Sequence, residues 1–267
     1  MSGESGEITV NARGKLKFNK GELLTGDFVE VENGAITKAY PRKNRLYRPN
    51  VSNVDAVCIL VSCAPAPDFL MIDKMLLTAC HLGVQCALVV NKSDLNGELY
   101  GKIKQEFAEA APHIFGVSAA TGENVGELKN FMRGKNVVLA GQSAVGKTTL
   151  TNAVFGTDFK TGELSDKLNR GKHTTTFSRI IKNGEFAVYD TPGFSEFTAD
   201  VDVSDAAANF PPYENYLGKC KYCDCTHTGE PFCAVDRAVK AGELSKTRYE
   251  RYKQIYAELK LLKEKKY

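Results

Sequence analysis

The chain has 267 residues, of which 43% are hydrophobic and 25% are charged, and its formal net charge is +3. These values are typical of an ordinary globular protein. No apolar run approaches the roughly 20 residues of a membrane-spanning helix and the polar N-terminus is unlike a signal peptide, so we expect a cytoplasmic protein without membrane contact.

Charge is distributed unevenly along the chain. Residues 1–50 carry 9 Lys and Arg against 6 Asp and Glu, and residues 219–267 carry 12 against 7, whereas residues 51–218 carry 14 against 19. Basic flanks around an acidic core favour two arms that contact a polyanion, although chance scatter over solvated surfaces would give the same counts.

The N-terminal region, over 1–49, predicts a small antiparallel barrel or sheet. Four short β-like runs are separated by glycine turns, and Asn33-Gly34 is typical of a tight hairpin turn. The runs cover residues 8–10, 15–18, 28–31 and 35–37. A basic stretch over 38–48 closes at Pro49 and is predicted to be a linker.

From residue 54 the pattern changes to alternating strands and helices, which predicts a parallel sheet with helices on both faces. Strands are predicted over 54–61, 86–90, 114–117 and 136–140, and helices over 69–82, 98–110 and 124–132. Two further strands, 177–182 and 185–190, turn at Asn183-Gly184. The scattered cysteines of this region, Cys58, Cys63, Cys80 and Cys86, are expected to be small core residues.

The last part of the chain is predicted to be helical. Residues 200–219 are interpreted as a connecting segment, and helices are expected over 234–241 and 245–264. One face of the longer helix is predicted to pack because its apolar residues recur three or four apart. These residues are Tyr249, Tyr252, Tyr256, Leu259 and Leu262.

A phosphate-binding loop is predicted where the strand over 136–140 runs into a helix. Its residues are Gly141, Gln142, Ser143, Ala144, Val145, Gly146, Lys147 and Thr148, followed by Thr149. The glycines let backbone N–H groups curl around a β-phosphate, and the helix N-terminus adds partial positive charge. We expect Lys147 to bridge β- and γ-phosphates and the Thr148 hydroxyl to ligate Mg²⁺.

A guanine-recognition segment, Asn91-Lys92-Ser93-Asp94, follows the strand over 86–90. Asp94 can accept from the ring N–H and the exocyclic amine of guanine, while Asn91 and the stem of Lys92 would hold and cover the base. Such a tetrad alone is usually a surface turn, but beside a phosphate loop it favours GTP over ATP. Ser118 and Ala119 follow the next strand, where a backbone N–H would meet the guanine carbonyl.

The order of these two motifs is inverted. In an ordinary GTPase the phosphate loop precedes the base-recognition tetrad, whereas here the tetrad at 91–94 precedes the loop at 141–148. Both motifs keep their internal spacing, so we infer a circularly permuted GTP-binding domain.

Two further segments are predicted to respond to the γ-phosphate. Asp190 suits an indirect contact to Mg²⁺, and Gly193 suits a backbone N–H that faces the γ-phosphate. Within residues 171–176, either Thr174 or Thr175 is predicted to reach Mg²⁺, and the sequence does not choose between them.

The residue after Gly193 predicts slow intrinsic hydrolysis. Ras-like enzymes place a water-orienting Gln there, whereas this chain has Phe194, which cannot orient water by hydrogen bonds. His173 is the nearest candidate for that role by sequence, although a lone loop histidine is usually only solvated.

A cysteine cluster predicts a structural zinc site. Five possible ligands crowd into residues 220–233, and Cys220, Cys225, His227 and Cys233 make a closed Cys₃His set. The spacing would also permit Cys220 and Cys223 as a Cys-x-x-Cys pair, which leaves Cys225 spare.

Taken together, these motifs resemble the RsgA (YjeQ) family of circularly permuted GTPases that depend on the small ribosomal subunit. The resemblance rests on residues 41–49 and 53–55, on the permuted motif order, on residues 171–175 and on the Cys-x4-Cys-x-His-x5-Cys pattern. It implies an α/β fold with an N-terminal OB-like barrel (1–49), a permuted P-loop core (50–199) and a C-terminal zinc-binding helical module (200–267). The N-terminal module has about four strand candidates where an OB barrel needs five.

The resemblance also implies a function. It implies hydrolysis of GTP to GDP, stimulated by the small ribosomal subunit and its rRNA during late assembly, with one structural Zn²⁺ and with Mg²⁺ bound alongside GTP. It favours His173 as the catalytic residue and leaves Cys223 free. We expect a monomer. The alternative function is an RNA-binding adaptor that uses GTP only as a structural ligand, but intact Lys147, Thr148 and Asp190 argue against a dead site.

Overall fold

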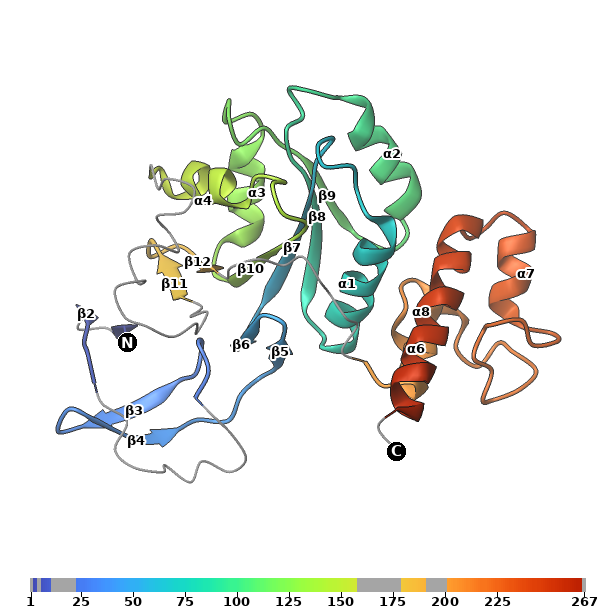
Figure 1. Cartoon of the computed structure of the whole chain (residues 1–267), viewed down its shortest axis with the longest axis horizontal. Coiled ribbons are helices and arrows are strands. Elements are labelled where there is room, and N and C mark those ends of the chain that lie inside the picture. Colours follow the sequence, from blue (N-terminus) through green and yellow to red (C-terminus); the bar gives the residue numbers. More distant parts are fainter. Residues whose placement is uncertain (1, 4–5, 11–22, 158–178, 191–200, 266–267) are drawn as a thin grey trace.

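A six-stranded sheet forms the centre of the molecule, with a pair of helices on each face (Figure 1). The computed structural model describes residues 2–3, 6–10, 23–157, 179–190 and 201–265. The strand order is β11-β12-β10-β7-β8-β9. The strands are β7 (Ala56–Val61), β8 (Gln85–Val90), β9 (His113–Gly116), β10 (Asn136–Ala140), β11 (Arg179–Lys182) and β12 (Ala187–Asp190).

The two faces of the sheet pack against different helices. Helices α1 (Phe69–His81) and α2 (Glu98–Phe107) cover one face, and α3 (Val125–Met132) and α4 (Lys147–Phe155) cover the other. In β7, Val57, Ile59 and Val61 enter the first core, and the residues between them enter the second. Burial on both sides explains why this strand is a continuous apolar run.

The predicted alternation of strands and helices is confirmed. Each predicted strand and helix from residue 54 to residue 140 is present, with its ends shifted by a few residues. Five strands are parallel to one another, and only β11 runs antiparallel, as the hairpin partner of β12. Among the described residues, no helix has the length and apolarity needed to cross a bilayer.

The described N-terminal region consists of separate strand pairs. β1 (Ser2–Gly3) pairs with β2 (Gly6–Glu7), and β3 (Val29–Glu32) pairs with β4 (Ala35–Ala39). The predicted turn at Asn33-Gly34 is confirmed, because both residues have positive φ, as a type I′ hairpin requires. The strand predicted over 8–10 is wrong, because β propensity alone does not make a strand. The run over 15–18 lies outside the described residues.

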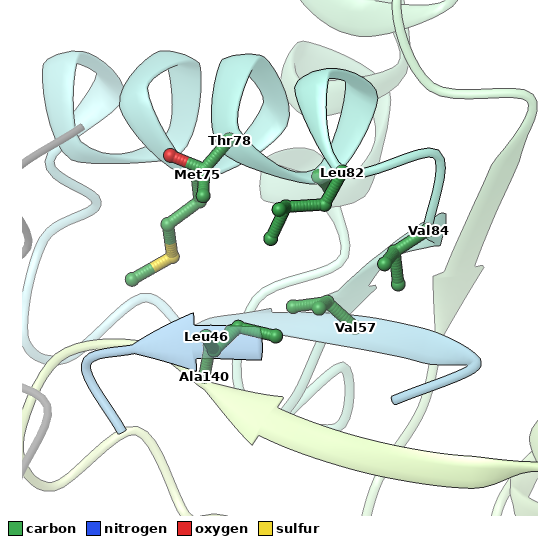
Figure 2. Close-up of a pocket in the computed structure, with 8 residues that line it drawn as sticks. Leu46, Val57, Met75, Thr78, Leu82, Val84 and Ala140 are labelled. Atoms are coloured by element: carbon green, nitrogen blue, oxygen red, sulfur yellow. The ribbon is translucent and has the colours of Figure 1, made fainter. Parts of the chain in front are cut away.

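The linker predicted near Pro49 is instead a packed hairpin. β5 (Arg45–Tyr47) pairs with β6 (Asn50–Ser52), and Leu46 and Val51 join the core beneath α1. Figure 2 shows Leu46 beside Val57 and Ala140, facing Met75 of α1 and Leu82, the residue that follows this helix. The prediction failed because Leu46 and Val51 are separated by basic and polar residues, so the sequence shows no apolar run that would indicate burial. The domain boundary predicted at residue 49 falls inside this hairpin.

A small cavity lies where the hairpin packs against α1. Its volume is about 10 Å³, near the least that one water occupies. Its only polar lining side chain is that of Thr78, whose hydroxyl donates to the Lys74 carbonyl. The cavity therefore offers a water at most one polar partner, fewer than the two to four that a buried water needs, and is expected to stay dry.

Part of the basic stretch is neutralised within the protein. The Arg42 Nε lies 2.7 Å from an Asp27 carboxylate oxygen, and the Lys43 Nζ lies 2.8 Å from Asp55. These two cations are therefore less available to a polyanion than the charge count suggests.

The C-terminal module contains more helix than predicted. Residues 200–219, interpreted above as a connecting segment, include α6 (Val203–Asn209) and a 3₁₀ turn, η1 (Tyr213–Tyr216), in the described part. That interpretation is wrong because Phe210 and Tyr213 pack into the module's own core. The two predicted helices are confirmed as α7 (Ala234–Lys240) and α8 (Lys246–Glu264).

The packed face of α8 differs by one position from the prediction. Tyr249, Tyr252 and Leu259 are buried as expected, but Leu262 is 42% exposed and Ile255 is fully buried. The buried stripe of α8 therefore ends at Leu259.

Buried ion pairs hold this module on the central domain. The Arg248 guanidinium of α8 lies 2.9 Å from Asp73 of α1, and both side chains are almost fully buried. Arg251 contacts Asp73 as well and lies 2.7 Å from Glu106 of α2. Burial raises the pKa of Asp73 and the two guanidinium groups oppose that rise. Removing one partner of such a pair leaves a buried charge uncompensated, which costs about 3–5 kcal/mol.

Leu46→Ala is expected to lower the free energy of unfolding by about 2–5 kcal/mol, because it enlarges an apolar cavity that cannot take up water. Urea unfolding followed by circular dichroism measures this. Leu95→Ala is the matched control, since Leu95 is 67% exposed. Equal stability of the two variants would show that the hairpin is not part of the core.

Candidate functional site

The predicted nucleotide motifs meet at one edge of the sheet. Parallel strands place their carboxyl ends together, so the segments after β8, β9 and β10 become neighbours although they are far apart in the sequence. β7 lies between β8 and β10, and its following loop (62–68) enters the same region.

The Asn91 side chain joins three of these segments. Its Nδ2 donates to the Val145 carbonyl of the phosphate loop at 2.9 Å, and its Oδ1 accepts from the Ala119 N–H at 3.0 Å. Asn91 is 2% exposed, so both bonds are shielded from water. A buried amide with both ends satisfied fixes the spacing between the base-recognition loops and the phosphate loop.

Lys92 spans the same junction from the surface side. Its Nζ donates to the Ala64 carbonyl at 2.7 Å and to the Ala144 carbonyl at 3.0 Å. Lys92 has φ of 62°, in the left-handed region, so the backbone turns sharply after Asn91. The aliphatic stem of Lys92 thereby crosses from the tetrad to the phosphate loop.

Two glycines of the phosphate loop are required by close approaches. A Cβ on Gly141 would lie 2.3 Å from the Leu60 carbonyl oxygen, and a Cβ on Gly146 would lie 2.3 Å from the Asn91 Nδ2. Both have positive φ, at 140° and 97°. The loop therefore reaches its shape only with glycine at these positions.

Lys147 opens α4 with its ammonium turned back over the loop. Its Nζ donates to the carbonyl oxygens of Gly141 and Gln142, at 2.7 and 2.8 Å. Burial lowers the pKa of Lys147. Thr148 and Thr149 follow in the first helical turn, where unpaired backbone N–H groups favour an anion. A phosphate oxygen can replace the two carbonyls as acceptor for the ammonium.

The residues predicted to bind the base differ in their exposure. Asp94 is exposed, while Ser93 is tied back by its N–H to the Val117 carbonyl (3.1 Å) and by its hydroxyl to Glu123 (3.2 Å). Ser118 is fully buried, and the Ala119 N–H already serves Asn91. A purine carbonyl at this edge would compete with Asn91 for that N–H.

The predicted γ-phosphate segments fall largely outside the described residues. His173, Thr174, Thr175, Gly193 and Phe194 all lie there. Asp190 is the last residue of β12, which is in register with β10, since Val138 pairs with Tyr189. The backbone of Asp190 therefore ends at the same sheet edge as the phosphate loop.

Sequence reasoning missed the loop over 62–68. Its Asp68 N–H donates to the Gln142 side chain at 3.2 Å, and its Ala64 carbonyl accepts from Lys92. Asp68 also caps α1 by accepting from the Met71 N–H. An aspartate before an apolar helix signals only the cap, so the contact with the phosphate loop had no sequence signal.

The predicted metal ligands are brought together in the C-terminal module. The ligand atoms of Cys220, Cys225, His227 and Cys233 all lie within 4.8 Å of one another. The three sulfur atoms are 3.6, 3.5 and 3.3 Å from the His227 Nδ1. A tetrahedral zinc site has ligand–ligand edges of about 3.6 Å, so this donor set fits Zn²⁺ in both chemistry and size.

The surroundings of the cluster suit a closed structural site. The Ala234 N–H donates to the Cys220 sulfur at 3.2 Å and the Asp236 N–H donates to the Cys233 sulfur at 3.5 Å, as thiolate ligands require. His227 is 3% exposed. Cys223 is exposed and is not among the four converging residues.

Comparison with known proteins gives one consistent result. The family model described as RsgA GTPase matches residues 39–200. The chain is 34% identical over 262 residues to the small ribosomal subunit biogenesis GTPase RsgA of Agathobacter rectalis, covering 93% of this chain and 86% of that protein.

Solved structures agree with this match. YjeQ from Thermotoga maritima aligns with a TM-score of 0.77 at 32% identity, covering 96% of this chain and 91% of that one. YloQ, described as a circularly permuted GTPase, aligns with a TM-score of 0.76 at 27% identity, covering 97% and 88%.

Gly146→Ala is expected to weaken binding of GDP, because the added methyl forces Asn91 away from Val145 and the backbone is strained. Strain of ~1–3 kcal/mol corresponds to about 5- to 150-fold in affinity. Titration with a fluorescent GDP analogue measures it. Gly156→Ala is the matched control. Gly156 follows the last residue of the same helix and also has a positive φ, of 67°, but a Cβ at this position would meet no atom within 4 Å. Equal affinities for the two variants would contradict this account.

Cys225→Ser is expected to release the metal and unfold the C-terminal module, because binding free energy of a structural zinc is folding free energy. Cys223→Ser should leave one equivalent bound. Elemental analysis of the purified variants distinguishes them, and the reverse pattern would reassign the ligands.

Proposed function

The chain belongs to the RsgA GTPase family, and on that premise we propose how its residues carry out GTP hydrolysis in the maturation of the small ribosomal subunit. The reaction converts GTP to GDP and phosphate, and the fold is that of a circularly permuted GTPase. The relatives are bacterial, so the proposed location is the cytoplasm, where ribosomes are assembled.

The observation that carries the proposal is the position of Asn91 between two motifs. Its hydrogen bonds to Val145 and Ala119 join residues 91–94 to residues 141–148, which supports a single site made from both predicted motifs. In this arrangement Asp94 would accept from the guanine N–H groups, and Ala119 or its neighbour would donate to the guanine carbonyl. Guanine is thereby distinguished from adenine by donors that adenine does not present together.

The phosphate side is proposed to work through charge. Lys147 would exchange its carbonyl partners for β- and γ-phosphate oxygens, and backbone N–H groups from Gln142 to Thr149 would surround the β-phosphate. When bound, Mg²⁺ neutralises charge on the phosphate oxygens. Thr148, one of Thr174 and Thr175, and Asp190 are proposed to hold it, and Gly193 is proposed to face the γ-phosphate.

Water activation is proposed to depend on the ribosomal subunit. Phe194 cannot orient water, so His173 is proposed to take that role when the subunit is bound. This predicts low turnover by the protein alone. The Cys220, Cys225, His227 and Cys233 set is proposed to bind one structural Zn²⁺, which keeps the loops of the C-terminal module in place.

Phosphate release in multiple turnovers tests the proposal. Purified small subunits are expected to raise the rate sharply, and large subunits are not. His173→Ala should abolish the stimulated rate while the affinity for GDP is retained. If small subunits leave the wild-type rate unchanged, the chain does not act as a subunit-stimulated GTPase, and a GTP-bound RNA adaptor becomes the better description.

A further inference from the structure

An aromatic and basic patch lies at the tips of the loops that hold the metal ligands. The patch consists of Lys219, Lys221, Tyr222 and Phe232. Phe232 is 63% exposed and Tyr222 is 44% exposed. The Lys221 Nζ lies 4.6 Å from the centre of the Phe232 ring and 5.7 Å from that of Tyr222, so the three side chains are neighbours.

From this patch we propose that the C-terminal module binds an unpaired RNA nucleotide, with the base stacked on Phe232 and Tyr222 and the adjoining phosphates held by Lys221 and Lys219. The proposal rests on the proposed function, which supplies an RNA-rich partner, and it assigns a contact that the nucleotide site does not provide.

The patch adjoins the four proposed metal ligands. Lys221 follows Cys220 and Phe232 precedes Cys233, so ligands of the cluster anchor both segments of the patch. With a metal bound, four side chains that converge on it would leave their neighbours little freedom. The rings are therefore presented in a fixed geometry, which reduces the entropy lost on binding.

The backbone of Phe232 is in an uncommon conformation. Its φ is 61°, in the left-handed region that a bulky residue rarely adopts. Hydrogen bonds order the preceding loop: the Glu230 carboxylate accepts from the N–H groups of Thr226 (2.7 Å), Thr228 (2.8 Å) and Gly229 (3.1 Å). Partial burial raises the pKa of Glu230, but these bonds and that of the Thr226 hydroxyl lower it to about 2. A strained residue that exposes a large apolar ring indicates a binding role rather than packing.

Charge favours a nucleic acid as the partner. In the described part of the chain, neither Lys219 nor Lys221 has an acidic group within ion-pair distance; each lies over an aromatic ring instead, Lys219 over Tyr216. Flat rings beside unpaired cations match a base beside its phosphates. The base must be unpaired, because a duplex hides its faces.

Fluorescence anisotropy with a labelled single-stranded RNA dodecamer and a duplex of the same length tests the proposal on the zinc-loaded full chain. Phe232→Gly is the decisive variant, because glycine adopts a positive φ without strain and the fold is retained. It is expected to weaken single-strand binding about tenfold. Phe232→Tyr should restore binding, and Leu261→Ala, at another exposed apolar side chain of the module, should have no effect.

Salt dependence separates the two parts of the patch. Lys221→Gln is expected to lower the slope of log affinity against log salt by about one, whereas Phe232→Gly should leave the slope unchanged. Wild-type affinity in Phe232→Gly, or an equal loss for duplex and single strand, would overturn the proposal.

The same variant distinguishes this inference from the proposed function. If small subunits stimulate wild-type hydrolysis and Phe232→Gly binds them as tightly as wild type does, only the patch assignment fails. Weaker binding of subunits by Phe232→Gly, with unchanged affinity for GDP, supports the assignment.

Discussion

The hydrogen bonds of the Asn91 amide are the constraint on which the nucleotide site depends. One end holds the phosphate loop through Val145, and the other holds the loop after β9 through Ala119. The same side chain leaves no room for a Cβ on Gly146, so the glycine and the asparagine require each other. Because this contact is made across the sheet edge, it is independent of which motif comes first in the chain.

Permutation changes what is attached to that edge. β7 is the first strand of the core and lies in the middle of the sheet, so its loop over 62–68 rests on the phosphate loop and leads directly into α1. The same helix carries Asp73, which holds Arg248 and Arg251 of the C-terminal module. The residue that caps α1 thus contacts the phosphate loop, and Asp73 of the same helix binds the C-terminal module. Strands β3 and β4 and this module lie on opposite sides of the molecule (Figure 1).

Much of this architecture was predictable from the sequence, and the exceptions have physical causes. Apolar runs buried on both faces and intact motif spacing predicted the parallel sheet and the positions of the loops. The hairpin over 45–52 and the helix at Val203–Asn209 were missed because their burial depends on tertiary partners that local patterns do not reveal. The Asp73–Arg248 pair was missed for the same reason, since a charged residue on a helix is usually solvated. The Cys₃His cluster was predictable because several cysteines and a histidine within one short segment are typical of a zinc site.

The central claim is that motifs in inverted order form one guanine-specific site, and replacing Asp94 by asparagine tests it most directly. A carboxylate accepts two hydrogen bonds from guanine, whereas an amide donates one and accepts one, which suits the C2 carbonyl of xanthine. Affinities for GDP and xanthosine diphosphate should be measured by competition against a fluorescent nucleotide. The account predicts that wild type prefers GDP and that Asp94→Asn prefers xanthosine diphosphate, with the fold intact. An Asp94→Asn protein that still prefers GDP as strongly as wild type would contradict it.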